Sequence, residues 1–510
     1  MHISIRKRVA SLLALPAFGT VALLLGGCPV SSADDCEALG NCTGSSNETT
    51  GTETQTETST ETTSSTVSPA CSTFAMGDVV DKACGVFVMP QTGDDNNAGT
   101  RDAPVASIKK ALEIGEGAPV YICEGTLVDL VNVEGSAHIF GGFACQTWEY
   151  TGVKPTVTSV ADFVPIQVAD NAFVYAQDIA VVGPDASDPG SSSVALFVHA
   201  GASIELVRVD ITAGQGALGL DGETPWGTGA DGEAGGAGKA GCVGPDNVIG
   251  GNGGLNTCGD VAPEGGSGGN GTAGTIGADG SKGQPAGGDG GTGQNGNTPC
   301  LIGGNGNPGM VGVSGAGADA LGTLSNMGFV GAVGAQGLVG SVGNGGGGGG
   351  GARQCSVGKA GPSGGGGGAG GCGGIGGGSG GGGGASIGIL AFQAKSMLFT
   401  NVVITAGNGG TGGTGGGGQA GGAGGGGGAK GEQGACAGGT GGDGGPGGAG
   451  GGGRGGHSIG IAWNTTAPPM DGVTITAGSG GLGGPGGIFN DALNEGVGAD
   501  GLAEKVLELP

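Results

Sequence analysis

The sequence predicts an all-β protein: a right-handed parallel β-helix with large Gly-rich insertions that form a polyglycine-II helix bundle. Two observations carry this prediction. Glycine recurs at every third position through long parts of the chain, as from Gly328 to Gly349. In addition, three segments of similar sequence flank or separate the glycine-rich blocks, namely Val207–Gly214, Asn401–Gly407 and Gly472–Gly478.

The glycine period indicates helices of the polyproline-II type. A period of three matches neither an α-helix nor a β-strand, and only glycine lets two backbones approach closely on the facing side of such a helix. Collagen has the same period but needs far more proline than the 22 residues present here. We therefore expect one chain folded back on itself, with a disordered glycine-rich linker as the alternative.

The three similar segments predict coils stacked on one another. Their alignment places aliphatic side chains in two columns, Ile211, Ile404 and Ile475 in one and Val209, Val402 and Val473 in the other. An alternating apolar run precedes each segment and begins at Ser193, Ser386 or Ser458. The same register puts Ile179 over Val209 and Val181 over Ile211. The glycine-rich blocks are then insertions at one corner of successive coils.

The N-terminal residues predict export and lipid anchoring. A basic start (Arg6, Lys7, Arg8) leads into an apolar run from Val9 to Leu25, which Gly26-Gly27-Cys28 follows. Leu25-Gly-Gly-Cys28 resembles the bacterial lipobox, which implies cleavage before Cys28 and a diacylglycerol on its sulfur. The alternative, a transmembrane anchor, requires a longer run without Pro16. The expected location is the bacterial cell envelope, at the outer membrane or cell surface.

Composition divides the remaining chain. We expect a signal peptide with lipobox at 1–28, a disordered Thr/Ser/Glu-rich stalk at 29–70, and the β-helix start with a capping helix at 71–213. The other expected segments are a polyglycine-II insertion at 214–384, a β-helix coil at 385–407, a second Gly-rich insertion at 408–456, and a last coil with a tail at 457–510. In that tail, Val506–Leu509 is expected to add a strand.

The start of the folded region shows a recognisable order of elements. Strand Val86–Met89 precedes the loop Gly93–Thr100, then Pro104 opens a helix with Val105, Ile108, Ala111 and Leu112 on one face, and strands Val120–Cys123 and His138–Phe143 follow. This order resembles the N-terminal start of pectin-lyase-like parallel β-helix proteins, which implies that the helix caps the first coil. The triplet tract resembles PGRS-type glycine-rich repeat proteins, although no PE-type leader is present.

Twelve cysteines besides Cys28 are an even number, which in an exported protein predicts up to six disulfides of undetermined pairing. They are Cys36, Cys42, Cys71, Cys84, Cys123, Cys145, Cys242, Cys258, Cys300, Cys355, Cys372 and Cys436. Several lie where the glycine period breaks, so we expect them to cross-link turns between packed helices.

Candidate sites for cofactors and catalysis are few. The Gly93–Thr100 loop could hold Ca²⁺, but Ala98 and Val105 stand where EF-hand ligands belong, so we expect a structural turn and no cofactor. The coil register stacks Asp178, Arg208, Asn401 and Gly472, then Ala180, Asp210, Val403 and Thr474, and neither column stacks carboxylates. Asp178 with Arg208 reads as a surface ion pair. Glycoside hydrolysis needs paired carboxylates, for which only Asp162 and Asp170 remain as candidates.

Histidine and tryptophan give no shared site. His138, His199 and His457 occupy different places in their repeats, so a common metal or catalytic role is not expected. Trp226 and Trp463 are expected to serve packing rather than ligand stacking.

Charge and composition narrow the function. A net charge of −26 argues against nucleic-acid binding, and 4% aromatic residues leave little for a conventional core. We expect no enzymatic activity, and a surface-anchored lipoprotein for display, adhesion or envelope structure. Its expected partners are the lipid bilayer, through the anchor, and glycans or surface proteins. The alternatives are a β-helix polysaccharide lyase or hydrolase, and an ice- or mineral-binding protein that would need a regular Thr/Asn face on the bundle.

Overall fold

The computed structural model describes residues 67–489, 492–493 and 496–510. This part of the chain is nearly all β, as expected: beside one 3₁₀ turn, Pro69–Cys71, it has a single α-helix, α1 (Ile108–Gly115). The expected signal peptide, the stalk up to residue 66, Cys28, Cys36 and Cys42 lie outside the described residues. None of the helices in the described part is long and apolar enough to cross a bilayer.

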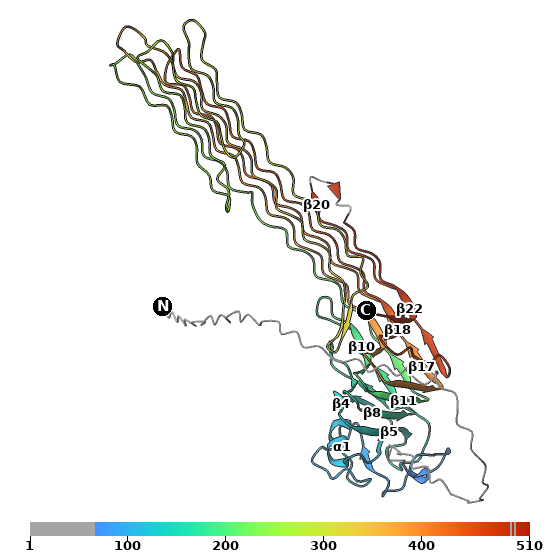
Figure 1. Ribbon diagram of the computed structural model, residues 1–510. Helices are drawn as coiled ribbons and strands as arrows, with labels where there is room; N and C mark the ends of the chain where they lie inside the picture. Colours follow the sequence, from blue (N-terminus) through green and yellow to red (C-terminus); the bar gives the residue numbers. More distant parts are fainter. Residues whose placement is uncertain (1–66, 490–491, 494–495) are drawn as a thin grey trace, which may run out of the picture. The chain divides into compact units, whose positions relative to one another are not determined.

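Strands between Val86 and Glu508 form three parallel six-stranded sheets (Figure 1). Sheet one runs β1 (Val86–Val88), β2 (Val120–Cys123), β5 (Ser136–Phe143), β8 (Phe173–Gln177), β11 (Ser203–Val207) and β16 (Ser396–Thr400). Sheet two runs β4 (Val131–Val133), β7 (Ile166–Val168), β10 (Ser193–Val198), β15 (Ser386–Ala391), β18 (Ser458–Trp463) and β22 (Ala503–Glu508). Sheet three runs β3 (Thr126–Val128), β6 (Thr156–Thr158), β9 (Ala180–Val182), β12 (Asp210–Thr212), β17 (Val402–Thr405) and β19 (Val473–Thr476).

From β2 to β18 the chain visits sheets one, three and two in turn, so each of these circuits adds one strand to each sheet. The last circuit contributes only β19 and β22. The predicted register is confirmed: Ile211 pairs with Ile404 and Ile404 with Ile475, while Val181 pairs with Ile211. Ser193, Ser386 and Ser458 also align. These aliphatic columns fill the space between the sheets and leave a residual cavity of only about 10 Å³. The predicted final strand is present as β22, which pairs with β18.

Helix α1 begins later than predicted. Ser107 is its N-cap and accepts a hydrogen bond from the Lys110 backbone N–H. Val105, predicted to lie in the helix, instead bridges Val88 in parallel fashion, since its N–H bonds to Phe87 O and its carbonyl accepts from Met89 N–H. Because this strand-like pairing already uses the backbone N–H and carbonyl of Val105, the helix starts only after this residue. Ile108 and Ala111 are fully buried against the first strands, which covers the open end of the sheets.

All three glycine-rich excursions leave sheet three and return to sheet two. They connect β12 to β15, β17 to β18, and β19 to β22. This confirms insertion at one corner. The last excursion, residues 477–502, belongs to the segment expected as a coil and tail. Two antiparallel hairpins interrupt the excursions, β13 (Thr323–Ser325) with β14 (Gly328–Val330) and β20 (Ile488–Phe489) with β21 (Ala492–Leu493).

Straight stretches of glycine-rich chain, such as 331–352 and 360–385, run side by side and are called rods below (Figure 1). Backbone hydrogen bonds join them: Gly337 N–H donates to Gly377 O at 2.9 Å and Gly366 N–H to Gly236 O at 2.9 Å. Glycine is required because added side chains would overlap neighbouring carbonyl oxygens. In the run 345–351, successive residues face three different rods in rotation, at 264–270, 436–439 and 289–292. A run of consecutive glycines is therefore found where a rod is surrounded by neighbouring rods on all sides.

Short polar side chains complete the edges of the bundle. Asp221 accepts from Thr414 N–H at 2.7 Å, Asp231 from Ala423 N–H at 2.7 Å, and Asp443 from Gly424 N–H at 2.8 Å. Each carboxylate takes the place of a missing neighbouring rod and satisfies a backbone donor. Sequence analysis predicted no role for these aspartates.

Among the described residues, five disulfides connect ten of the predicted cysteines. The pairs are Cys71–Cys84, Cys123–Cys145, Cys242–Cys355, Cys258–Cys372 and Cys300–Cys436. The last three join turns or rods of the bundle, which confirms the expected staples. Because they close loops of 113, 114 and 136 residues, they remove much of the freedom of a glycine-rich unfolded chain.

Candidate functional site

An open cleft of about 840 Å³ lies beside the first strands of sheet one. Strands β1, β2 and β5 are parallel neighbours, so the segments that follow them emerge at the same edge of the sheet. These segments supply the lining residues Met89, Gln91, Thr92, Asn97, Arg101, Asp102, Pro104, Glu124, Gly125, Cys145, Gln146 and Trp148.

The Cys123–Cys145 disulfide and the packing of Trp148 hold the wall of the cleft in place. The Cys123–Cys145 disulfide joins the end of β2 to the loop after β5, with Cα atoms 4.8 Å apart. Trp148 follows with φ +57°, an uncommon conformation for a residue with a side chain. Its N–H bonds to Ala144 O, its carbonyl accepts from Val80 N–H, and its ring packs edge-on against Phe87. The surrounding packing therefore imposes this backbone geometry.

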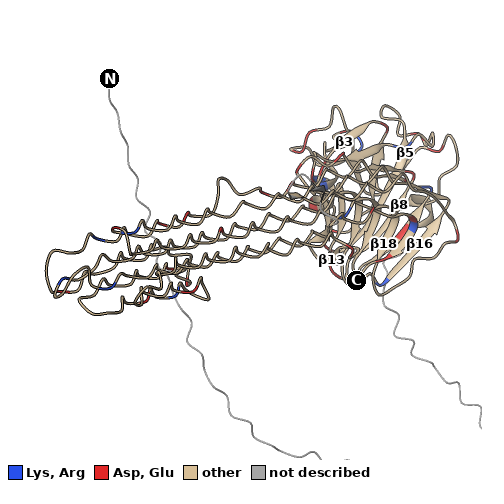
Figure 2. Cartoon of the chain, turned by 90° about the horizontal axis from the view of Figure 1, so that it is seen from above, with Lys and Arg blue, Asp and Glu red and all other residues tan. Residues whose placement is uncertain are grey.

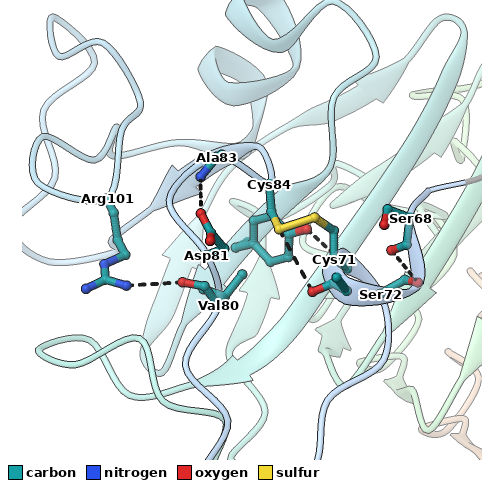
Figure 3. Close-up of a disulfide and its surroundings, with 10 residues drawn as sticks. Ser68, Cys71, Ser72, Val80, Asp81, Ala83, Cys84 and Arg101 are labelled. Carbon is teal, nitrogen blue, oxygen red and sulfur yellow. Dashed lines mark hydrogen bonds between the residues drawn. A yellow bond between two sulfur atoms is a disulfide. The ribbon is translucent and has the colours of Figure 1, made fainter.

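A second disulfide supports Arg101, a cation that lines the cleft. Its Nη1 donates to Val80 O at 3.1 Å, and Val80 belongs to the segment closed by Cys71–Cys84 (Figure 3). Tyr121 Oη donates to Cys71 O at 2.6 Å, and burial raises the pKa of this phenol. Arg101 is thereby held at the cleft by a cross-linked segment.

The cleft combines charged and amide groups with an apolar floor. Arg101, Asp102 and Glu124 carry charge, the side chains of Gln91, Asn97 and Gln146 offer both donors and acceptors, and Met89 and Trp148 contribute apolar surface. Such a set can bind a polar ligand by several directed hydrogen bonds. The cleft was not predicted from the sequence, because the residues that line it form no motif. The spacing of Cys123 and Cys145 was the one available signal.

The loop Gly93–Thr100, considered above for calcium, has a structural use. Asp95 Oδ1 accepts from the N–H groups of Ala106 and Ser107, and Oδ2 accepts from Ser107 Oγ. Asp94 accepts from Asn96 N–H and Nδ2, and these bonds lower the pKa of Asp94. Both carboxylates turn the chain toward α1. Among the described residues, no group of three or more His, Cys, Asp or Glu side chains is placed to hold a metal ion.

Asp178 and Arg208 form the ion pair that the sequence suggested, but only the arginine reaches the surface, where 42% of its side chain is exposed. Asp178 is 2% exposed, and Arg208 binds it through Nε at 2.7 Å and Nη2 at 2.6 Å. Tyr150 Oη also donates to Asp178 at 2.8 Å and covers the carboxylate. Hydrogen bonding to Asp178 raises the pKa of Arg208. The burial of Asp178 was not predicted because Tyr150 comes from a loop distant in the sequence.

The column containing this pair is a stack of left-handed turns. Asp178, Arg208, Asn401 and Gly472 all have positive φ, between 53° and 74°. The column sits where the chain turns from sheet one to sheet three. This backbone conformation is unfavourable for residues that carry a side chain, and the bidentate contact between Asp178 and Arg208 offsets its cost.

The remaining carboxylate candidates are not brought into one site. Asp162 accepts from the N–H groups of Ser187 and Asp188, and the bonds to Ser187 lower its pKa. Asp170 is exposed at a turn. Asp162 thus fastens a loop, and neither residue lines the cleft.

Histidine and tryptophan are dispersed. His138 contacts the rings of Phe173 and Tyr175, His199 stacks on Phe197, and His457 lies buried at the base of the bundle. Trp463 packs against the core. Trp226 is 91% exposed, so the packing expected for it is wrong: it lies on a rod at the edge of the bundle, with no described rod over its ring.

Comparison with known proteins identifies no family. No protein-family model matches the chain. No curated protein matches it either. Among solved structures, a rhamnogalacturonan lyase is similar over 26% of this chain and 36% of its own length, at 20% identity and a TM-score of 0.21.

Proposed function

We propose that this protein is a non-enzymatic lipoprotein, anchored in the bacterial cell envelope through Cys28, that displays a stiff glycine-rich bundle for adhesion or envelope structure. We further propose that the three sheets form a right-handed parallel β-helix and that the rods are polyglycine-II helices. The observation that carries the proposal is the network of backbone hydrogen bonds between rods, with buried glycine at their contacts.

This network supports a mechanical role. Rods joined through their backbones and cross-linked by three disulfides resist bending more than a flexible glycine linker would. Many apolar side chains on the bundle are exposed, among them Met310, Val313 and Leu338, whose segments lie side by side. A surface of this kind is typical of contact with another surface or molecule.

The test compares cells producing the wild type with cells producing Cys28→Ala. We expect the wild type to partition with detergent and to be labelled by a membrane-impermeant reagent on whole cells, and the variant to lose membrane association. Equal membrane association of the two proteins would contradict the anchor. A protein labelled only after cell lysis would contradict surface display.

The second candidate function is a polysaccharide lyase or hydrolase. It is favoured by the cleft, where Asp102 and Glu124 accompany Arg101. Its test is release of new reducing ends or unsaturated sugars from acidic and neutral polysaccharides, with Glu124→Gln as the matched control. Activity lost in that variant would favour the enzyme.

The third candidate is ice or mineral binding. A threonine row lies on sheet three rather than on the bundle: Thr212 pairs with Thr405, and Thr405 with Thr476. The Lys154–Asp210 ion pair, 2.7 Å long, lies beside this row. Inhibition of ice recrystallisation, lost in Thr405→Lys but kept in Lys395→Glu, would support this candidate.

A further inference from the structure

Acidic residues of the glycine-rich excursions are spread along the rods, whereas basic residues gather toward the end of the bundle remote from the sheets (Figure 2). Carboxylates of the rods are exposed along their length, at Asp221, Glu223, Asp231, Glu233, Glu264, Asp289 and Asp443. The turns remote from the sheets, at 242–248, 272–276, 294–298, 353–359 and 430–436, form what is called the distal tip. Four basic residues lie in or directly beside it: Lys239, Arg353, Lys359 and Lys430.

Backbone contacts bring these cations together. Lys239 N–H donates to Ser363 Oγ at 2.8 Å, and Gly431 N–H donates to Ser363 O at 3.1 Å, so Lys239 and Lys430 flank one residue. Ala360 N–H donates to Gly244 O, which places Lys359 beside the first turn. The Cys242–Cys355 disulfide fixes these two turns.

In the part of the chain that the structure describes, the four basic side chains of the distal tip are not engaged in ion pairs with carboxylates and can bind an anionic group. By contrast, Lys282 on a rod binds Asp289 at 3.1 Å. By the same criterion, three acidic residues lie in or directly beside the tip turns, Asp246, Asp279 and Glu432, so the four basic residues leave the tip one positive charge in excess in a protein of net charge −26.

Two apolar side chains project from the same turns. Val243 is 84% exposed and follows Cys242, while Val357 is 95% exposed and lies two residues after Cys355. Water is an unfavourable environment for both. A polyanion would neutralise the lysines but offer no apolar surface to the valines.

We propose that the distal tip is a docking surface for an anionic lipid bilayer. The lysines and arginine bind lipid phosphates, and the two valines enter the headgroup boundary. The acidic rods are repelled by the same surface, so the bundle meets the bilayer end-on. The inference rests on the proposed anchored display: one end of the chain is held in its own membrane, and the tip contacts an opposing one.

The experiment uses the full lipidated chain reconstituted in immobilised phosphatidylcholine vesicles. Retention of the protein on these vesicles reports the anchor. Capture of a second, fluorescent vesicle population, with or without phosphatidylglycerol, reports the tip. We expect capture only with phosphatidylglycerol, decreasing as salt rises. Retention without capture would overturn the tip proposal and leave the anchor intact, whereas loss of retention would overturn the anchor.

Matched variants locate the contact. Lys359→Glu with Lys430→Glu should reduce capture at least about tenfold. The control, Lys82→Glu with Lys395→Glu, reverses two exposed lysines in the region of the sheets and should leave capture unchanged. Equal thermal unfolding of the two double variants checks the fold. Equal loss of capture in both would contradict a specific tip.

A third variant tests the choice of partner. Val243→Ser with Val357→Ser should weaken vesicle capture while leaving retention on a polyanionic resin unchanged. If this variant captures vesicles as well as the wild type, the tip recognises charge alone and the bilayer proposal is wrong. Capture that requires protein on both vesicle populations would likewise overturn it and indicate contact between copies.

Discussion

Gly334 lies so close to Gly451 that a Cβ on Gly334 would overlap the carbonyl oxygen of Gly451. Its neighbour Val333 points away from this contact and is 61% exposed. The difference between adjacent positions follows from a chain with three residues per turn, in which only one position in three meets a given neighbour.

Replacing Gly334 by valine should therefore lower the free energy of unfolding far more than Val333→Leu, since one side chain enters a backbone contact and the other enters solvent. Thermal unfolding and limited proteolysis of the two variants measure the difference. Equal behaviour, or rapid cleavage of the wild-type rods, would exclude a packed bundle.

The buried His457 should make the protein sensitive to acid. Its Nδ1 accepts from Leu502 N–H at 2.8 Å, so the neutral ring carries its proton on Nε2, 2.7 Å from Leu321 O. Burial lowers the pKa of His457, and Arg454 adds to this, although the Leu321 carbonyl opposes it. In the window between this lowered value and about 6.5, the unfolded chain binds a proton that the folded chain does not.

Stability should thus be fully present above about pH 6.5 and fall as the pH drops through this window. Denaturant unfolding between pH 8 and 5 measures the slope, and His457→Gln should reduce it. Part of the slope should remain, because burial also lowers the pKa of His138 and His199. A slope unchanged in His457→Gln would show that this imidazole is protonated in the fold.

Each aspartate at the edge of the bundle should contribute on its own to the free energy of unfolding. Asp231→Ala leaves the Ala423 N–H without its protein acceptor and should cost about 1 kcal/mol. Asp231→Asn keeps a carbonyl oxygen and should cost less. Hydrogen exchange at Ala423 and chemical unfolding measure both effects. The control is Asp260→Ala at an exposed turn, and an equal effect there would mean that general charge, not the hydrogen bond, is responsible.

The disulfide between rods should stabilise the bundle mainly through the unfolded state. Replacing Cys258 and Cys372 by serine opens a loop of 114 residues and should cost about 2–5 kcal/mol. Thermal unfolding of this double variant, beside one lacking Cys71 and Cys84, compares a long loop with a short one of 13 residues. A larger loss from the short loop would argue against the entropic account. Thiol counting on the denatured, non-reduced wild type should find none of these ten cysteines free.

Local pattern was sufficient wherever one residue type had to recur in one environment. The glycine period predicted close backbone packing, because a side chain on the contact face cannot fit, as Gly334 and Gly451 illustrate. Likewise, the spacing of Ile211, Ile404 and Ile475 predicted their stacking, because each coil buries the same face.

The tertiary structure decided the features that depend on partners remote in the sequence. Val105 left the expected helix because Phe87 and Met89 offered it strand-like hydrogen bonds. Tyr150 buried an aspartate that the coil register alone placed at the surface. The cleft and the basic distal tip arise in the same way: loops and turns with no common motif meet only because parallel strands end together and rods reverse together. A repeat in the sequence shows which positions must be buried or must lack a side chain. Which residues contact those positions depends on the tertiary fold, because the partners are distant in the sequence.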